Sequence, residues 1–324
     1  MSAAQRPVVI TCGEPAGIGP EVAAAAWSAL RGNVPMVWIG DPRHLPADTP
    51  VHLIDDPAAQ REAPPDAMPV IAHPFDGAAT PGRADPRNAQ GVIDVIARAV
   101  DLVRSGAAAA LCTAPIHKKA LQDGAQFAYP GHTEYLGALA GGARAVMMLA
   151  CEELRVVPAT IHIPLADVPA ALTPDLLRDT IEITARDLRT RFGIAAPRIA
   201  VAGLNPHAGE GGAMGRQEVE WIAPLLAAMR GEGHDITGPL PADTMFHAAA
   251  RQSYDVAICM YHDQALIPIK TLDFDRGVNV TLGLPFVRTS PDHGTAFDIA
   301  GKGIASPASM IEAIRLAARL GRGA

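Results

Sequence analysis

The sequence predicts an α/β protein, and three observations lead to that class. The chain has 324 residues, which is too long for one small core and indicates two domains or one large α/β unit. Its composition, 49% hydrophobic and 19% charged, is typical of a globular protein rather than a disordered one. Short apolar runs alternate with amphipathic segments, beginning with a strand, a turn, a helix and a second strand.

The first elements follow from an apolar run and a glycine-rich turn. Residues 8–11 read VVIT, which is typical of a buried strand, and residues 13–19 form the turn. Pro20 suits the first turn of a helix, where its missing N–H costs nothing, so we expect a helix to about Leu30. Residues 36–39 are the next strand.

The same glycines suggest a dinucleotide-binding fingerprint, in which Asp41 would hold the ribose of the cofactor. The match is incomplete, because Val22 stands where the third glycine should be when the motif starts at Gly17. A tight turn that requires glycine explains the pattern without a cofactor, and we favour that interpretation.

The remaining elements are predicted from apolar periodicity and from capping residues. Thr173 and Pro174, for example, are the N-cap and first residue of a helix that Gly193 stops. We expect further strands at 51–54, 68–71, 107–112, 145–149, 156–162, 199–202 and 256–260, and helices at 88–104, 174–192, 216–230 and 307–320.

Charge and apolar content exclude two classes of partner. The net charge of −7, with scattered Lys and Arg, argues against nucleic acid. No apolar run approaches the roughly 20 residues that cross a membrane. The first residues, MSAAQRPVVIT, lack the apolar core of a signal peptide. Cys12, Cys112, Cys151 and Cys259 are far apart, so we expect free thiols and a cytoplasmic protein.

Three histidines each follow a strand-like run. They are His162, His207 and His262. Because the ends of parallel strands meet at one edge of a sheet, these side chains can converge, and three imidazoles leave a divalent cation open positions for substrate. The alternative for His162, which ends the run ATIHIPL, is a half-buried histidine with no ligand.

The segment 261–303 gathers polar and cationic residues between glycines and prolines, and we expect a long irregular segment that presents a site. Lys270 and Arg288 are embedded in apolar runs, LIPIKTL and LPFVRTS, which is unusual for solvated surface cations. His132 and Thr133 stand at a predicted helix start, where free N–H groups favour an anion. Together these residues predict a pocket for a phosphate or carboxylate. Equally, Thr133 can simply cap its helix.

Seven motifs, in this order, make the chain resemble the 4-hydroxythreonine-4-phosphate dehydrogenase family of pyridoxine biosynthesis. They are GEPAGIGPE, GHTE, ATIHIPL, GLNPHAGEGG, GPLPADT, MYHDQ and RGVNVTLGLPFVRTSPDHGTA, and they cover essentially the whole chain. The resemblance implies NAD-dependent oxidation of 4-phosphooxy-L-threonine at C3, followed by decarboxylation to 3-amino-2-oxopropyl phosphate.

The resemblance also implies roles for individual residues. It makes His162, His207 and His262 the ligands of a divalent metal (Zn, Mg or Co), and His132, Thr133, Lys270, Asn279 and Arg288 the substrate ligands. The proton acceptor stays open between Asp243, Asp263 and a water on the metal, and Lys270 is a further candidate catalytic residue.

The run HGTAFDIAGKGIASP is similar to the adenosine-binding loop of isocitrate and isopropylmalate dehydrogenases. This likeness implies that NAD, or NADP, binds at His293, Gly294 and Asp298. It also implies two α/β/α-layered domains with the active site in the cleft between them. We expect the first domain to comprise residues 1–130 with about 295–324, and the second residues 131–294.

The family resemblance further implies a homodimer in which each metal site is shared, with His162 and His207 from one subunit and His262 from the other. Two alternatives remain. One is a related dehydrogenase that acts on another phosphorylated or carboxylated hydroxy acid. The other, from a different class, is a three-histidine metallohydrolase that needs no NAD.

Overall fold

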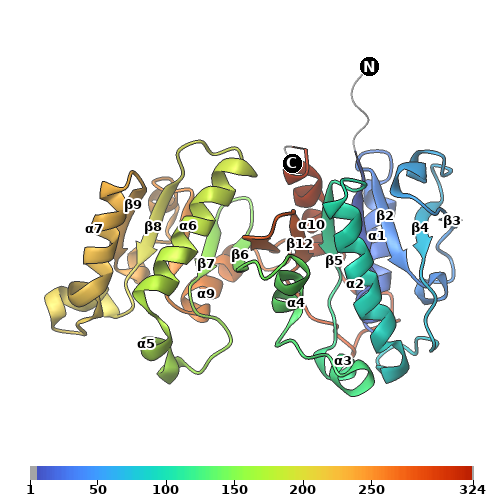
Figure 1. The fold of residues 1–324 in the computed structure, drawn as a ribbon, viewed down its shortest axis with the longest axis horizontal. Coiled ribbons are helices and arrows are strands. Elements are labelled where there is room, and N and C mark those ends of the chain that lie inside the picture. Colours follow the sequence, from blue (N-terminus) through green and yellow to red (C-terminus); the bar gives the residue numbers. More distant parts are fainter. Residues whose placement is uncertain (1–5, 323–324) are drawn as a thin grey trace. The chain divides into compact units, whose positions relative to one another are not determined.

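The computed structural model describes residues 6–322 and divides into two compact units (Figure 1). One unit comprises the residues up to Ala145 and those from Leu284 onward, and the other comprises Val146–Gly283. These divisions differ from the boundaries near 130 and 294 that the sequence suggested. Residues 131–145 belong to the first unit, because helix α4 (His132–Leu139) packs on α2 (Ala89–Arg104).

The first unit is built on a parallel sheet with the strand order β3-β4-β2-β1-β5-β12. The strands are β1 (Val8–Thr11), β2 (Met36–Gly40), β3 (Val51–Leu53), β4 (Met68–Ala72), β5 (Ala110–Thr113) and β12 (Arg288–Pro291). Strand β1 is buried along its whole length, as expected for a strand covered on both faces. The helices are α1 (Gly19–Leu30), α2, α3 (Lys118–Ala125), α4 and α10 (Ala308–Leu320). Helices α1 and α10 pack on each other, and α2 packs on β1, β2 and β5.

The second unit has the strand order β11-β6-β7-β10-β8-β9. Its strands are β6 (Val146–Ala150), β7 (Arg155–Pro158), β8 (Arg198–Ala202), β9 (Asp235–Leu240), β10 (Val256–Cys259) and β11 (Val278–Leu282). Strands β7, β10, β8 and β9 are parallel, whereas β6 runs antiparallel to both of its neighbours. The helices are α5 (Val168–Ala171), α6 (Pro174–Thr190), α7 (Ala223–Gly231), α8 (Ala248–Arg251) and α9 (His262–Leu272). Helix α9 packs on β6, β7 and β10.

The α/β prediction is confirmed, and most elements lie within a few residues of their expected positions. Helix α6 begins as predicted, because the Thr173 hydroxyl accepts a hydrogen bond from the Leu176 N–H at 3.2 Å and Pro174 follows. Described residues include no helix long and apolar enough to cross a membrane.

Two expectations about local structure were wrong. Strand β7 stops at Pro158 rather than at 162, and His162 adopts a left-handed backbone conformation with φ of 42°. The segment 261–303 is not one irregular loop, because it contains α9, β11 and β12. Helix α9 forms because Ala265, Leu266 and Ile269 share one buried face, although Pro268 lies inside it.

Candidate functional site

The three candidate metal ligands follow three neighbouring strands of the second unit. Strand β10 pairs in parallel with β7 on one side and with β8 on the other. His162 lies four residues beyond β7, His262 directly begins α9 after β10, and His207 lies in the loop after β8. The topology therefore brings the three strand ends to one edge of the sheet, as predicted.

His162 and His262 lie side by side, with their ring centroids 5.6 Å apart. Nδ1 of His262 is 2.7 Å from Oδ1 of Asp263, which fixes the orientation of that ring. A cavity of about 260 Å³ opens beside the two rings and is lined by residues of the 160–168 segment together with Tyr261, His262 and Asp263.

His207 does not join this pair. It begins a run of five residues, 207–211, that all have left-handed backbone conformations. The His207 side chain is 60% exposed, and its Nδ1 is 3.5 Å from Oε2 of Glu210. Between residues 6 and 322, no three His, Cys, Asp or Glu side chains converge as a ligand set. The expected convergence of all three histidines is therefore not found within one chain, where His162 pairs with His262 instead of with His207.

The histidine pair fits a divalent cation. Two imidazoles that bind one ion tetrahedrally through nitrogens at about 2.1 Å have ring centroids about 5 Å apart, close to the observed 5.6 Å. Because Asp263 occupies Nδ1 of His262, Nε2 is the nitrogen left to bind an ion. The described residues thus offer a cation two imidazole nitrogens and one orienting carboxylate, and a complete site would need a third ligand.

The first unit holds the best-defined cationic group. Arg288 is 4% exposed, and its Nε and Nη2 donate to the hydroxyl oxygen of Thr113 at 3.1 and 2.6 Å. Burial lowers the pKa of Arg288 to about 10, so it stays positively charged at neutral pH. Sequence reasoning missed Thr113, whose one available signal was its position as the last residue of the buried run ALCT.

His132 lies near this guanidinium. Burial, and then the charge of Arg288, lower the pKa of His132 well below its ordinary value, so its ring is neutral at pH 7. Its Nε2 is buried and has no hydrogen-bond partner among the described residues. Helix α4 begins at His132 as predicted, but Gly131 is the N-cap and Thr133 makes no capping hydrogen bond. Thr133 is therefore not used as a cap. A charged donor and an unpaired imidazole nitrogen suit an anion.

Lys270 and Asn279 belong to the second unit. Lys270 lies in the last turn of α9, with its Nζ 5.4 Å from the centroid of the Phe274 ring. Asn279 lies within β11, opposite Leu149 of β6, and its Oδ1 is buried without a hydrogen-bond partner among the residues described. Asp243 is exposed in the short turn Ala242–Thr244, which lies against the loop that carries His207.

The predicted cofactor residues lie in the first unit, between β12 and α10. Gly294 and Asp298 are exposed, and Nδ1 of His293 is 3.0 Å from its neighbour's carbonyl oxygen, on Gly294. The glycine-rich turn before α1 supports this loop, because the Ile18 N–H donates to the Thr295 carbonyl at 3.0 Å. A Cβ added to Gly17 would lie 2.8 Å from that same oxygen, so only glycine fits.

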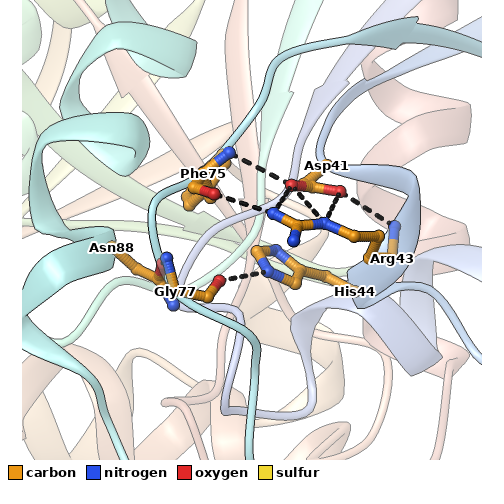
Figure 2. A network of polar contacts seen from close by, with 6 residues as sticks. All are labelled: Asp41, Arg43, His44, Phe75, Gly77 and Asn88. Carbon is orange, nitrogen blue, oxygen red and sulfur yellow. Dashed lines mark hydrogen bonds and ion pairs between the residues drawn. The ribbon is translucent and has the colours of Figure 1, made fainter.

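Asp41 belongs to a network of hydrogen bonds within the protein (Figure 2). This network bears on the alternative interpretation in which Asp41 holds the ribose of a dinucleotide. Its carboxylate accepts hydrogen bonds from the Arg43 side chain, from the Arg43 N–H at 3.0 Å and from the Phe75 N–H at 3.1 Å. The residue is 3% exposed. A ribose would have to displace these donors, so the structure gives Asp41 no role in holding one.

Comparison with known proteins identifies one family, and the match extends over nearly the whole chain. The family model described as "Pyridoxal phosphate biosynthetic protein PdxA" matches residues 32–317. A 4-hydroxythreonine-4-phosphate dehydrogenase from Roseobacter denitrificans is 69% identical over 321 residues, covering 99% of this chain and 98% of that protein.

Solved structures of 4-hydroxythreonine-4-phosphate dehydrogenases also match the chain. The crystal structure of 4-hydroxythreonine-4-phosphate dehydrogenase from Klebsiella pneumoniae is 41% identical, covers 98% of this chain and 99% of its own, and superposes with a TM-score of 0.88. A terephthalate 1,2-cis-dihydrodiol dehydrogenase from Burkholderia xenovorans is 27% identical, with 97% and 98% coverage and a TM-score of 0.67. The chain therefore belongs to the family of the pyridoxal phosphate biosynthetic protein PdxA, and the curated relative named above and others like it are 4-hydroxythreonine-4-phosphate dehydrogenases.

Proposed function

We propose that this protein oxidises 4-phosphooxy-L-threonine at C3 with NAD⁺ and releases CO₂ to give 3-amino-2-oxopropyl phosphate. The observation that carries the proposal is the 69% identity, over 99% of the chain, to a curated 4-hydroxythreonine-4-phosphate dehydrogenase. In the reaction a hydride leaves C3 for NAD⁺ and the hydroxyl loses its proton. The resulting β-keto acid then breaks its bond to the carboxylate.

The substrate is a dianionic phosphate ester with a carboxylate, and five residues are proposed to hold it. Arg288 and His132 are supported by burial of a guanidinium and by an unpaired ring nitrogen. Thr133, Lys270 and Asn279 complete the proposed set, and the buried, unpaired Oδ1 of Asn279 suits the substrate's ammonium group. Charge-assisted contacts of this kind orient C3 against the nicotinamide.

A divalent cation is proposed at His162, His207 and His262, where it would act as a Lewis acid toward the hydroxyl of the substrate. Asp263 holds the ring of His262 in position, since its carboxylate lies 2.7 Å from Nδ1. With Asp263 engaged in this way, Asp243 is the better candidate to accept the C3 hydroxyl proton, in competition with water. Lys270 binds an anionic group and keeps it close to the reacting carbon.

NAD is proposed at the loop that contains His293, Gly294 and Asp298, with NADP as the less favoured cofactor. A cavity of about 650 Å³ lies between α1, the 42–50 segment and residues Gly301, Gly303 and Ala305, which follow this loop in the sequence. Its size suits part of a dinucleotide. The four cysteines are free, which is consistent with a protein that works in the cytoplasm.

We further propose a homodimer with shared metal sites, because one chain brings together only two of the three histidines. Two mixing experiments test it. His162→Ala/His207→Ala protein is refolded with His262→Ala protein, and His162→Ala/His262→Ala protein is refolded with His207→Ala protein. Random pairing makes about half of the dimers hybrids, and each hybrid has at most one intact site of two. The mixture whose substitutions match the way the two subunits divide the three histidines should therefore recover about a quarter of wild-type activity. If a single chain supplied all three ligands, neither mixture would regain activity.

The test of the reaction itself is NAD reduction across a panel of phosphorylated hydroxy-amino acids and carboxylated dihydrodiols, with and without divalent metal. We expect turnover of 4-phosphooxy-L-threonine that requires both NAD and metal. Preference for a carboxylated dihydrodiol would favour the second candidate function, to which the 27% identity with a dihydrodiol dehydrogenase draws attention. Turnover without NAD would instead favour a metallohydrolase.

A further inference from the structure

The hydroxyl of Thr113 is the acceptor for two donors of a single guanidinium. Nε and Nη2 of Arg288 donate to it at 3.1 and 2.6 Å. Thr113 is completely buried and Arg288 is 4% exposed, so water does not compete for these bonds. A threonine hydroxyl can accept two hydrogen bonds, and here both come from the same side chain.

The strand pairing fixes this contact. Thr113 is the last residue of β5 and Arg288 is the first of β12, and the two strands are parallel, with Arg288 opposite Leu111. Side chains two residues apart on a strand share a face, so Thr113 lies on the same face as Leu111 and hence as Arg288. The Leu111 N–H also donates to the Val287 carbonyl at 2.9 Å, which ties the strands together where Arg288 begins.

A guanidinium has a rigid planar fork of donors, so fixing two of them fixes the direction of the others. The usual partner for such a fork is a carboxylate, which would offset the positive charge. Thr113 is neutral and orients the guanidinium without offsetting it. Burial, and then this charge, lower the pKa of His132, so His132 lies close to the guanidinium.

We propose that Thr113 is a positioning residue, which holds Arg288 in the orientation that binds the anionic group of the substrate. This inference rests on the function proposed above, in which Arg288 is a substrate ligand. It assigns specificity for an anion to a residue that does not itself touch the substrate.

The experiment compares Thr113→Val and Thr113→Ser with wild type. Affinity for 4-phosphooxy-L-threonine is measured by calorimetry without cofactor, and KM and kcat are measured with NAD. Valine has the shape of threonine but no hydroxyl, so Thr113→Val should weaken binding and raise KM about tenfold with little change in kcat. Thr113→Ser keeps the hydroxyl and should stay within about twofold of wild type.

A double-mutant cycle excludes a merely structural effect. In an Arg288→Met background, Thr113→Val should cause no further loss of affinity, because its effect passes through the guanidinium. Thr289→Val is the matched control, since Thr289 is equally buried on β12 and its hydroxyl donates to the Ala313 carbonyl at 2.8 Å. That variant should lose thermal stability and keep its substrate affinity.

Two results would overturn the inference: wild-type affinity in Thr113→Val, or the same loss from Thr113→Val with and without Arg288. A wild-type protein that does not bind 4-phosphooxy-L-threonine would instead contradict the proposed function. In that event the same cycle is read with inorganic phosphate as the probe, and the same two results decide the role of Thr113.

Discussion

Replacing Asp41 by asparagine tests whether the Asp41 carboxylate stabilises the fold or binds the cofactor. Burial would raise the pKa of Asp41, but hydrogen bonds from the Arg43 side chain and from the Arg43 and Phe75 N–H groups outweigh it and lower the pKa from 3.8 to about 2. That difference corresponds to about 2 kcal/mol of unfolding free energy at neutral pH.

The sign follows from the direction of the pKa change. A carboxyl group whose pKa is lower in the folded state stabilises the fold above its unfolded pKa, and this stability is lost as the pH falls through 3.8 toward about 2. Asp41→Asn should therefore lower the unfolding free energy by about 2 kcal/mol at pH 7. Because asparagine does not titrate here, the difference from wild type should shrink to about half of that at pH 3.

The assay is urea unfolding at pH 7 and pH 3, followed by tryptophan fluorescence. Trp38 is fully buried in β2, three residues before Asp41, and reports on the same region. KM for NAD is measured in parallel and should be unchanged in Asp41→Asn. Asp298→Ala is the matched control, because Asp298 is exposed and belongs to the proposed cofactor loop. It should raise KM for NAD more than KM for substrate, with wild-type stability.

An Asp41→Asn protein of wild-type stability with a strongly raised KM for NAD would refute this reasoning. It would show that the glycine-rich turn and Asp41 form a dinucleotide site after all. A stability difference that persists undiminished at pH 3 would refute the assignment of the effect to an ionised carboxylate.

Three further substitutions test the site. Gly17→Ala places a methyl group 2.8 Å from the Thr295 carbonyl, so it should destabilise the protein by about 1–3 kcal/mol and raise KM for NAD. If the variant had the same KM for NAD as wild type, the glycine-rich turn would not support cofactor binding by the 293–298 loop. Lys270→Met and Arg288→Met should each weaken substrate binding by about 1.5–3 kcal/mol, measured by calorimetry, and unchanged affinity in either variant would exclude that cation from the substrate site. His207→Ala should lose metal affinity and turnover together while its circular dichroism stays that of wild type, and full activity after metal removal would contradict a metal role.

Much of the fold was predictable because the sequence encodes burial locally. VVIT in β1 and the Thr173-Pro174 cap of α6 each specify their element within a few residues. Helix α9 was missed because Pro268 normally ends a helix, and the buried face made by Ala265 and Ile269 outweighs it.

The site was less predictable because it depends on backbone geometry and on pairing between strands. Apolar runs predict where the strands lie, but the left-handed turn at 207–211, which carries His207, has no apolar periodicity that would predict it. Asp41 was ambiguous for a related reason. The tripeptide Asp-Pro-Arg recurs at 85–87, where Asp85 likewise accepts hydrogen bonds from the Arg87 N–H and side chain, and this repetition was the available sign of a structural motif.

Selection for thermostability should act first on the turn at 207–211. His207, Ala208 and Glu210 have φ angles of 51°, 52° and 43°, a region in which each non-glycine residue costs about 1–2 kcal/mol. Glycine at 208 or 210 would relieve part of that strain, so heat-selected variants should accumulate it there. If the strained backbone is what holds the His207 imidazole in place, such variants will melt later and turn over more slowly. At this turn, a gain in thermal stability would then come with a loss of turnover.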